Sequence, residues 1–181
     1  MIKVIAFDLV GVLVRENDFA LTPEEEKLER MFGPNINDEE FLLTAGKIIP
    51  NNAQLIETAK HIVENIYDIR EENLLKNIKE NFPEVKIVIA TNHVSYIKNF
   101  IIKNFETKYL DDIFISAIIN KIKPNEDFYE HILHKFNISS QELLFLDDNL
   151  ENIDGAKSLD INTIKVEKNT NIYSSVIEFL E

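Results

Sequence analysis

The chain has 181 residues, enough for one domain of ordinary size with a substantial buried core. Cysteine is absent, which excludes disulfides and thiolate metal sites. Nineteen basic and thirty-two acidic side chains give a net charge of −13, which repels phosphate backbones and acidic lipids, and no apolar run approaches the ~18 residues of a membrane span. We therefore expect a cytoplasmic protein, without a leader segment, that partners neither nucleic acid nor a membrane.

The first predicted element is an apolar strand that begins at residue 2 or 3 and ends at Asp8. Four later apolar runs resemble it, at 85–90, 113–118, 143–146 and 161–166, the second being the weakest. Between them the spacing predicts amphipathic helices at 94–104, 126–136, 149–159 and 172–180. Strands that alternate with helices predict an α/β fold with a doubly wound parallel sheet.

The segment that follows the first strand has helical periodicity and no convincing strand. Thr22-Pro23-Glu24-Glu25 is a capping box that opens a helix reaching about residue 32, and Asn37 begins another helix. Further helices are predicted at 53–66 and 70–81. Roughly 60 residues exceed a single crossover connection, so we expect a small helical cap. The predicted division is a core of 1–14 and 82–181, with 15–81 as cap and return helix.

Polar side chains stand where the predicted strands end or just beyond. They are Asp8, Thr91-Asn92-His93, Lys123-Pro124 and Asp147-Asp148-Asn149. Taken singly, the later groups have structural interpretations: a helix cap, a solvated loop lysine and an acidic helix start. Asp8 does not, because a buried carboxylate without a partner costs several kcal/mol. Since parallel strand ends converge on one crevice, we expect all four groups to meet.

The order of these groups resembles that of the haloacid dehalogenase (HAD) superfamily across nearly the whole chain. The most detailed likeness is at 144–156, Leu-Phe-Leu-Asp-Asp-Asn-Leu-Glu-Asn-Ile-Asp-Gly-Ala, which is similar to the fourth motif of sugar-phosphate phosphatases and of the phosphatase domain joined to some epoxide hydrolases. The resemblance implies a HAD-like Rossmannoid core with a small C1-type helical cap after strand one. A receiver domain is the competitor, but it is shorter and has its acid pair after strand one.

The resemblance also implies roles for the clustered residues. Asp8 would be the nucleophile that attacks phosphorus and forms an aspartyl phosphate. Asp8, Asp148 and the backbone carbonyl of Val10 would hold Mg²⁺, with Asp147 either ligating or supporting them, and oxygen donors suit this hard cation. The phosphoryl oxygens would be bound by Thr91, Asn92 and Lys123. Mg²⁺ and Lys123 would supply the positive field that an acidic protein otherwise lacks.

Val10 departs from the family pattern. Most family phosphatases have an aspartate at this position, which protonates the leaving oxygen and later activates water. General acid-base help is worth ~10²–10⁴ in rate, so its unreplaced loss predicts a slow enzyme. The metal site is unaffected, because position 10 contributes only a carbonyl. Some sugar-phosphate phosphatases of this type also lack the acid, so Val10 does not by itself imply inactivity.

Histidine and arginine offer further candidates. His93 is the natural replacement proton donor, since imidazole titrates near neutral pH and lies two residues past Thr91. The alternative, which we favour, is a first-turn helix residue that faces solvent. Arg15 either reaches the substrate or lies on the surface. Surface positions are predicted for the remaining histidines, His61, His131 and His134.

Three functions remain open. The leading hypothesis is a Mg²⁺-dependent hydrolase of a small phosphorylated metabolite, with a sugar phosphate as the expected example. The second is a catalytically weak or inactive binding or regulatory protein, motivated by Val10. The third is a 2-haloacid dehalogenase-like C–halogen hydrolase, against which the Asp147-Asp148 pair indicates a metal that dehalogenation does not need.

Overall fold

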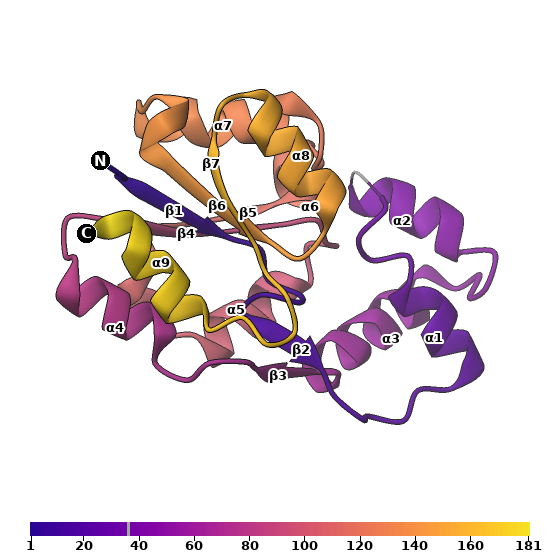
Figure 1. Ribbon diagram of the computed structural model, residues 1–181. Helices are drawn as coiled ribbons and strands as arrows, with labels where there is room; N and C mark the ends of the chain where they lie inside the picture. Colours follow the sequence, from indigo (N-terminus) through magenta and orange to yellow (C-terminus); the bar gives the residue numbers. More distant parts are fainter. Residues whose placement is uncertain (36) are drawn as a thin grey trace.

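The computed structural model describes residues 1–35 and 37–181. Its centre is a five-stranded sheet in the order β5-β4-β1-β6-β7, and all neighbouring strands in it are parallel (Figure 1). The strands are β1 (Val4–Phe7), β4 (Lys86–Thr91), β5 (Asp112–Ile115), β6 (Leu143–Asp147) and β7 (Asn162–Lys165). The predicted α/β fold with a parallel sheet is confirmed.

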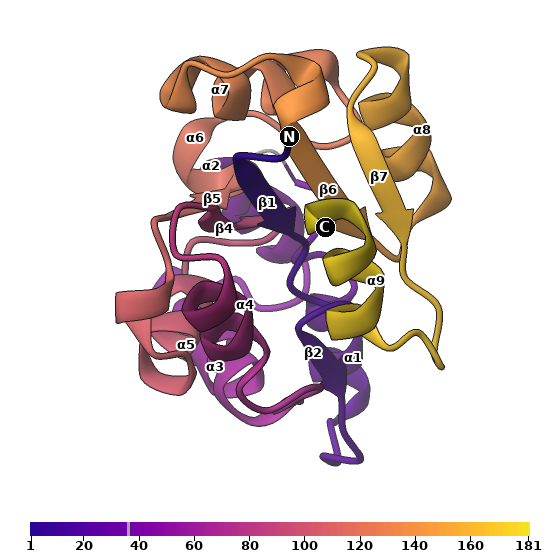
Figure 2. The same cartoon turned by 60° about the vertical axis from the view of Figure 1, so that its left-hand side comes forward.

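Helices cover both faces of this sheet (Figures 1 and 2). One face carries α4 (Leu74–Asn81), α5 (Ile97–Asn104) and α9 (Ile172–Leu180), and the other carries α7 (Glu126–Phe136) and α8 (Leu150–Ser158). Side chains along β1 point alternately to the two faces of the sheet, and each face has its own hydrophobic core. Ile5 and Phe7 pack in the core on the first face, and Val4 and Ala6 in the core on the second. Near-continuous apolar strands are what a sheet buried on both faces requires.

The segment between β1 and α4 extends beyond the carboxyl end of the sheet (Figure 1). It contains α1 (Pro23–Glu29), α2 (Asp38–Ala45) and α3 (Asn52–Asn65). The capping box at Thr22 is present, with the Glu25 side chain bonded to the Thr22 backbone. Apolar side chains from these helices join the larger core of the sheet, so the helical insertion is packed against the rest of the chain.

Two short strands in this segment contradict the expectation of a purely helical insertion. β2 (Val14–Glu16) and β3 (Tyr67–Ile69) form an antiparallel ribbon at the two ends of the insertion. Three residues are too few for alternation to show in a sequence, and the ribbon depends on pairing across about fifty residues. The predicted helix at 70–81 is wrong at its start. Asn73, with a left-handed φ of 60°, precedes the helix, and α4 begins at Leu74.

Smaller differences lie at strand and helix ends. The predicted strand at 113–118 ends at Ile115, and the short helix α6 (Ser116–Ile119) follows it directly. The helix predicted from 94 begins at Ile97, because residues 92–94 form a loop that carries part of the site. Two 3₁₀ turns complete the elements, η1 (Thr107–Tyr109) and η2 (Ser140–Glu142). Within 1–35 and 37–181, no helix is long and apolar enough to cross a membrane.

Candidate active site

The predicted site residues do meet at the carboxyl edge of the sheet. Phe7 of β1 is in register with Ile89 of β4 and with Leu146 of β6, so the residues that follow these positions lie side by side. The Asp8 N–H donates to the Leu146 carbonyl at 2.8 Å, which fixes the nucleophile candidate at the strand end. Asp8, Thr91, Lys123 and Asp147 are all buried.

Lys123 links two of the carboxylates. Its Nζ lies 2.9 Å from Asp8 Oδ1 and 2.6 Å from Asp147 Oδ2, and 1% of its side chain is exposed. Burial alone would lower the pKa of Lys123, but the two carboxylates outweigh it and raise the pKa above its ordinary value. Lys123 therefore remains a cation at the centre of the site.

Asn92 holds the backbone of Lys123 in place. Its Oδ1 accepts from the Lys123 N–H at 2.9 Å and its Nδ2 donates to the Lys123 carbonyl at 2.8 Å, next to the cis Lys123–Pro124 peptide bond. The amide group at the end of β4 thus clamps the loop that presents the lysine. This positioning contact was not expected from the sequence. The role of Asn92 in binding phosphate, implied by the resemblance, stays a prediction.

Three carboxylates crowd around this lysine. Oxygens of Asp8, Asp147 and Asp148 lie within 4.8 Å of one another. Burial raises the pKa of Asp8 to about 7, with Asp147 adding to the rise and Lys123 opposing it. Burial and the neighbouring Asp147 also raise the pKa of Asp148. One lysine does not offset three charges, so a second cation is needed to keep the cluster ionised.

The hydrogen bonds divide the roles among these carboxylates. Asp147 accepts from Lys123 Nζ and from the Asn149 N–H, and Asn152 Nδ2 donates to both of its oxygens, so both oxygens are engaged. Asp148, in contrast, has no side-chain donor among the described residues. Oxygen donors in this number fit a hard divalent cation such as Mg²⁺. The arrangement favours Asp148 as a ligand and Asp147 as its support.

Gly11 makes room for Asp148. A Cβ atom at Gly11 would lie 2.3 Å from Asp148 Oδ2, and the residue has φ +85°, which favours glycine. The loop after β1 and the loop after β6 can therefore approach only because position 11 has no side chain. Among the described residues, the close neighbour of Gly11 is thus the Asp148 carboxylate.

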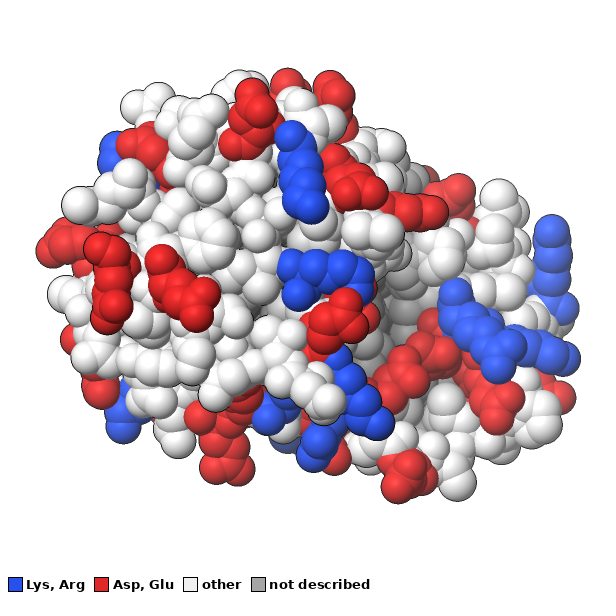
Figure 3. Space-filling view, viewed as in Figure 1, with Lys and Arg blue, Asp and Glu red and all other residues white. Residues whose placement is uncertain are grey.

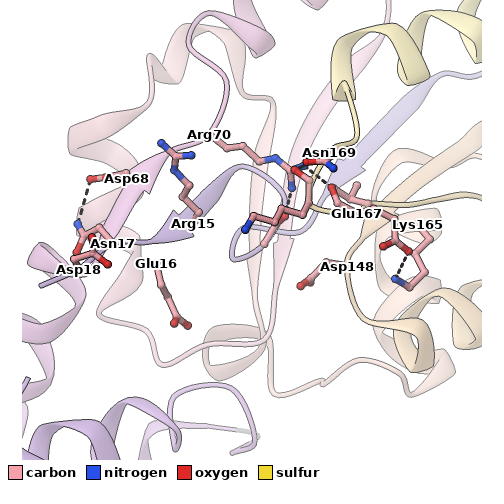
Figure 4. A pocket seen from close by; sticks show the side chains of 13 residues that line it. Arg15, Glu16, Asn17, Asp18, Asp68, Arg70, Asp148, Lys165, Glu167 and Asn169 are labelled. Atoms are coloured by element: carbon pink, nitrogen blue, oxygen red, sulfur yellow. Dashed lines mark hydrogen bonds and ion pairs between the residues drawn. The ribbon is translucent and has the colours of Figure 1, made fainter.

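Arg70 is a site-supporting residue that sequence reasoning missed. Its Nη1 donates to the Gly11 carbonyl at 2.6 Å, and its Nη2 donates to the carbonyls of Glu167, Lys168 and Thr170 at 2.5, 3.0 and 3.3 Å (Figure 4). The guanidinium joins the loop after β1 to the loop after β7. No sequence signal pointed to it, because Arg70 lies where a helix was predicted and its partners are backbone atoms far along the chain.

Two hollows open from this edge of the sheet, and Asp148 lines both. The smaller, about 500 Å³, contains Asp8, Val10 and Thr91 with Gly33 and Pro34 of the helical insertion. The larger, about 900 Å³, lies beside the β2–β3 ribbon and is lined by charged side chains, including the exposed Arg15 (Figure 4). Figure 3 shows a hollow between the sheet region and the helical insertion, with acidic and basic side chains on its rim.

His93 does not face solvent, so that expectation is wrong. The residue is 2% exposed, its ring centroid lies 5.3 Å from that of Phe32, and its Nε2 lies 3.2 Å from the Tyr67 hydroxyl. Burial lowers the pKa of His93 to about 4. His93 is absent from the side chains that line the Asp8 cavity, and these contacts do not support it as a proton donor. The predicted exposure holds for His61 and His134, while His131 is partly buried.

Comparison with known proteins identifies the family of this chain. The family model of the haloacid dehalogenase-like hydrolases matches residues 5–166. The chain belongs to this family. Over 56 residues it is 39% identical to the sesquiterpene phosphatase astK of Aspergillus oryzae, a match that covers 31% of this chain and 29% of that protein. The chain thus spans less than a third of the length of this curated relative.

Solved structures of the family share the fold. A HAD-like family hydrolase from Porphyromonas gingivalis has a TM-score of 0.74 and 20% identity, covering 100% of this chain and 98% of that one. A variant of the HAD family enzyme bt-2542 from Bacteroides thetaiotaomicron, in complex with magnesium and inorganic phosphate, has a TM-score of 0.74 and 16% identity, covering 98% and 99%. These structures share the fold of this chain, and the family match over residues 5–166 confirms the predicted superfamily.

Proposed function

We propose that this protein is a Mg²⁺-dependent hydrolase of a small phosphorylated metabolite that works through an aspartyl phosphate on Asp8. The observation that carries the proposal is the buried contact of Lys123 with Asp8 and Asp147, beside Asp148. A relative named as a phosphatase and a HAD enzyme solved with magnesium and inorganic phosphate support it.

In this proposal each residue has a distinct task. Asp8 attacks phosphorus through the carboxylate oxygen that Lys123 does not engage, while Lys123 holds the other oxygen and adds positive charge near the phosphoryl group. Thr91, buried at the end of β4 on the wall of the Asp8 cavity, donates its hydroxyl to a phosphoryl oxygen. Asp8, Asp148 and the Val10 carbonyl would hold Mg²⁺, which neutralises charge on the transferred group, with Asp147 supporting.

We further propose that residues 15–81 contain a cap over the site, with 1–14 and 82–181 as the core. Gly33 and Pro34 form a wall of the Asp8 cavity opposite the sheet. Asp38 at the start of α2 accepts from the Ser95 N–H at 2.8 Å and from the Ser95 hydroxyl, just past the Thr91 loop. These contacts hold the helical insertion against the residues that would bind phosphate.

A weakly catalytic binding protein is the second candidate, because Val10 has no titratable group and His93 does not face the cavity. C–halogen hydrolysis is less well supported, since three clustered carboxylates favour a metal that this reaction does not require. Purified protein that binds phosphate with Mg²⁺ but releases none from any ester would favour the second candidate.

The test is phosphate release from a panel of phosphate esters. Activity should require Mg²⁺, stop with EDTA and be lost in Asp8→Asn. The matched control is Asp154→Asn, which removes an exposed carboxylate from α8 and should retain wild-type rates. Phosphate release that persists in a folded Asp8→Asn protein would contradict the covalent mechanism.

A further inference from the structure

The cavity over Asp8 has an apolar side chain where a proton donor is expected. Val10 is half-buried, packs against the larger core and lines the same 500 Å³ cavity as Asp8 and Thr91. Its backbone pairs with Val14, which leads into the β2–β3 ribbon. The position is therefore tied into the fold, and its side chain has no proton to give.

The other titratable groups of this cavity are already engaged or exposed. Among the described residues that line it, these groups are Asp8, Lys123, Asp147, Asp148 and Glu151. The first three form one hydrogen-bonded network, and Asp148 packs against Gly11. Glu151 lies in the first turn of α8 and is exposed. No buried carboxylic acid in this lining is left to protonate a departing oxygen.

The absence of a buried donor affects substrates unequally. An alkoxide is a poor leaving group and needs a proton as the P–O bond breaks, whereas an enolate, a carboxylate, a phenolate or a phosphate leaves as a stable anion. General acid help is worth ~10²–10⁴ in rate, and that factor applies to the first kind of substrate. A site built like this one discriminates by the chemistry of the leaving group.

We propose that the substrates of this protein are phosphate compounds whose leaving group departs as a stable anion: enol, acyl or aryl phosphates and phosphoanhydrides. The inference rests on the proposed function. Asp8 forms a bond to phosphorus while the bond to the leaving oxygen breaks, and that oxygen keeps the electron pair. Water then attacks the aspartyl phosphate, releasing inorganic phosphate and the Asp8 carboxylate, and the proton of the water passes to phosphate or solvent. Sugar phosphates with an alkoxide leaving group are then poor substrates.

The test compares leaving groups in the wild type and two variants at one position. Kcat/KM is measured with Mg²⁺ for acetyl phosphate, a series of substituted phenyl phosphates and alkyl phosphates, because this constant reports the steps up to transfer onto Asp8. The wild type should show a steep dependence on the leaving group. Val10→Asp should raise kcat/KM for alkyl phosphates by ~10²-fold or more and change it less than about tenfold for nitrophenyl phosphate. Val10→Asn, similar in shape to the aspartate variant but without an acid, should not raise kcat/KM for alkyl phosphates relative to nitrophenyl phosphate.

Three other results would overturn the leaving-group proposal, and one of them would also overturn the proposed function. Comparable kcat/KM for alkyl and nitrophenyl phosphates in the wild type overturns the leaving-group proposal and leaves the proposed function standing. A loss of alkyl phosphate turnover in Glu151→Gln would also overturn the leaving-group proposal, because it would make Glu151 the proton donor. Absence of phosphate release from every compound, including acetyl phosphate, together with absence of a phosphorylated protein by intact mass, overturns both proposals.

Discussion

Lys123 Nζ and Asp8 Oδ1 lie 2.9 Å apart although 115 positions separate the two residues in the chain. The contact exists because β1 is central in the sheet, and the loop that carries Lys123 reaches over its end. It brings a cation to the candidate nucleophile in a protein whose net charge is −13. The local field at Asp8 is thus opposite in sign to the field of the whole molecule.

Removing this lysine should destabilise the fold. Lys123→Met leaves Asp8 and Asp147 buried without their partner, and breaking a buried pair costs ~3–5 kcal/mol. Urea unfolding at pH 8 in EDTA measures the free energy of unfolding. The control is Lys121→Met, which removes a partly exposed lysine paired with the exposed Asp127 and should cost less than ~1 kcal/mol. Equal losses in the two variants would contradict the importance of the buried pair.

Gly11 and Gly33 offer a matched pair of substitutions. In Gly11→Ala the new Cβ would lie 2.3 Å from Asp148 Oδ2 at a positive φ, so we expect weaker Mg²⁺ binding and loss of most activity. In Gly33→Ala the nearest atom is the Asn92 carbonyl at 3.5 Å, an ordinary contact, and activity should be retained. Isothermal titration with Mg²⁺ and rate measurements check both. Unchanged Mg²⁺ affinity in Gly11→Ala would show that Asp148 can move freely.

Arg70 should act on metal binding through the backbone. Arg70→Lys keeps the positive charge but removes the guanidinium group, whose two Nη atoms donate to the Gly11 carbonyl and to carbonyls of the 167–170 loop. Loss of such supporting contacts typically costs ~10–100-fold in metal affinity, so we expect a ~10-fold weaker apparent Mg²⁺ affinity. Titration of the melting temperature with Mg²⁺ measures it, and Arg30→Lys at the exposed end of α1 is the control. A lower melting temperature with unchanged Mg²⁺ affinity would indicate a purely structural role.

His93 predicts a pH dependence of stability. Burial lowers its pKa from 6.5 to about 4 in the folded chain. Between these pH values the unfolded chain binds a proton that the folded chain does not, so this contribution to stability is complete above about 6.5 and is lost as the pH falls towards 4. The shift in pKa corresponds to a loss of ~3 kcal/mol in the free energy of unfolding between neutral pH and pH 4.

Substitution isolates this contribution of His93. His93→Gln should reduce the difference in unfolding free energy between pH 7 and pH 4.5, measured by urea unfolding in EDTA. His134→Gln, which changes an exposed histidine at the end of α7, is the matched substitution for comparison. Parallel profiles for His93→Gln and the wild type would mean that the buried imidazole titrates normally.

Much of the candidate site could be predicted because its chemistry lies at strand ends. Asp8, Thr91 and Asp147 end or directly follow strands with near-continuous apolar character, and parallel strands bring such ends together. The ribbon of β2 and β3 and the burial of His93 could not be predicted. Each depends on partners far along the chain, Tyr67 and Phe32 in the case of His93, and local periodicity has no information about them.

The sequence by itself determined the α/β class, the family and the set of polar residues that converge, because strand periodicity and the order of Asp8, Thr91, Lys123 and Asp147-Asp148 are local patterns. Only the tertiary structure decided how these residues are held. The Asn92 clamp on Lys123, the contact of Gly11 with Asp148 and the Arg70 bridge each join a side chain to the backbone of a distant segment. Such contacts depend on distances between loops, which a one-dimensional pattern does not encode.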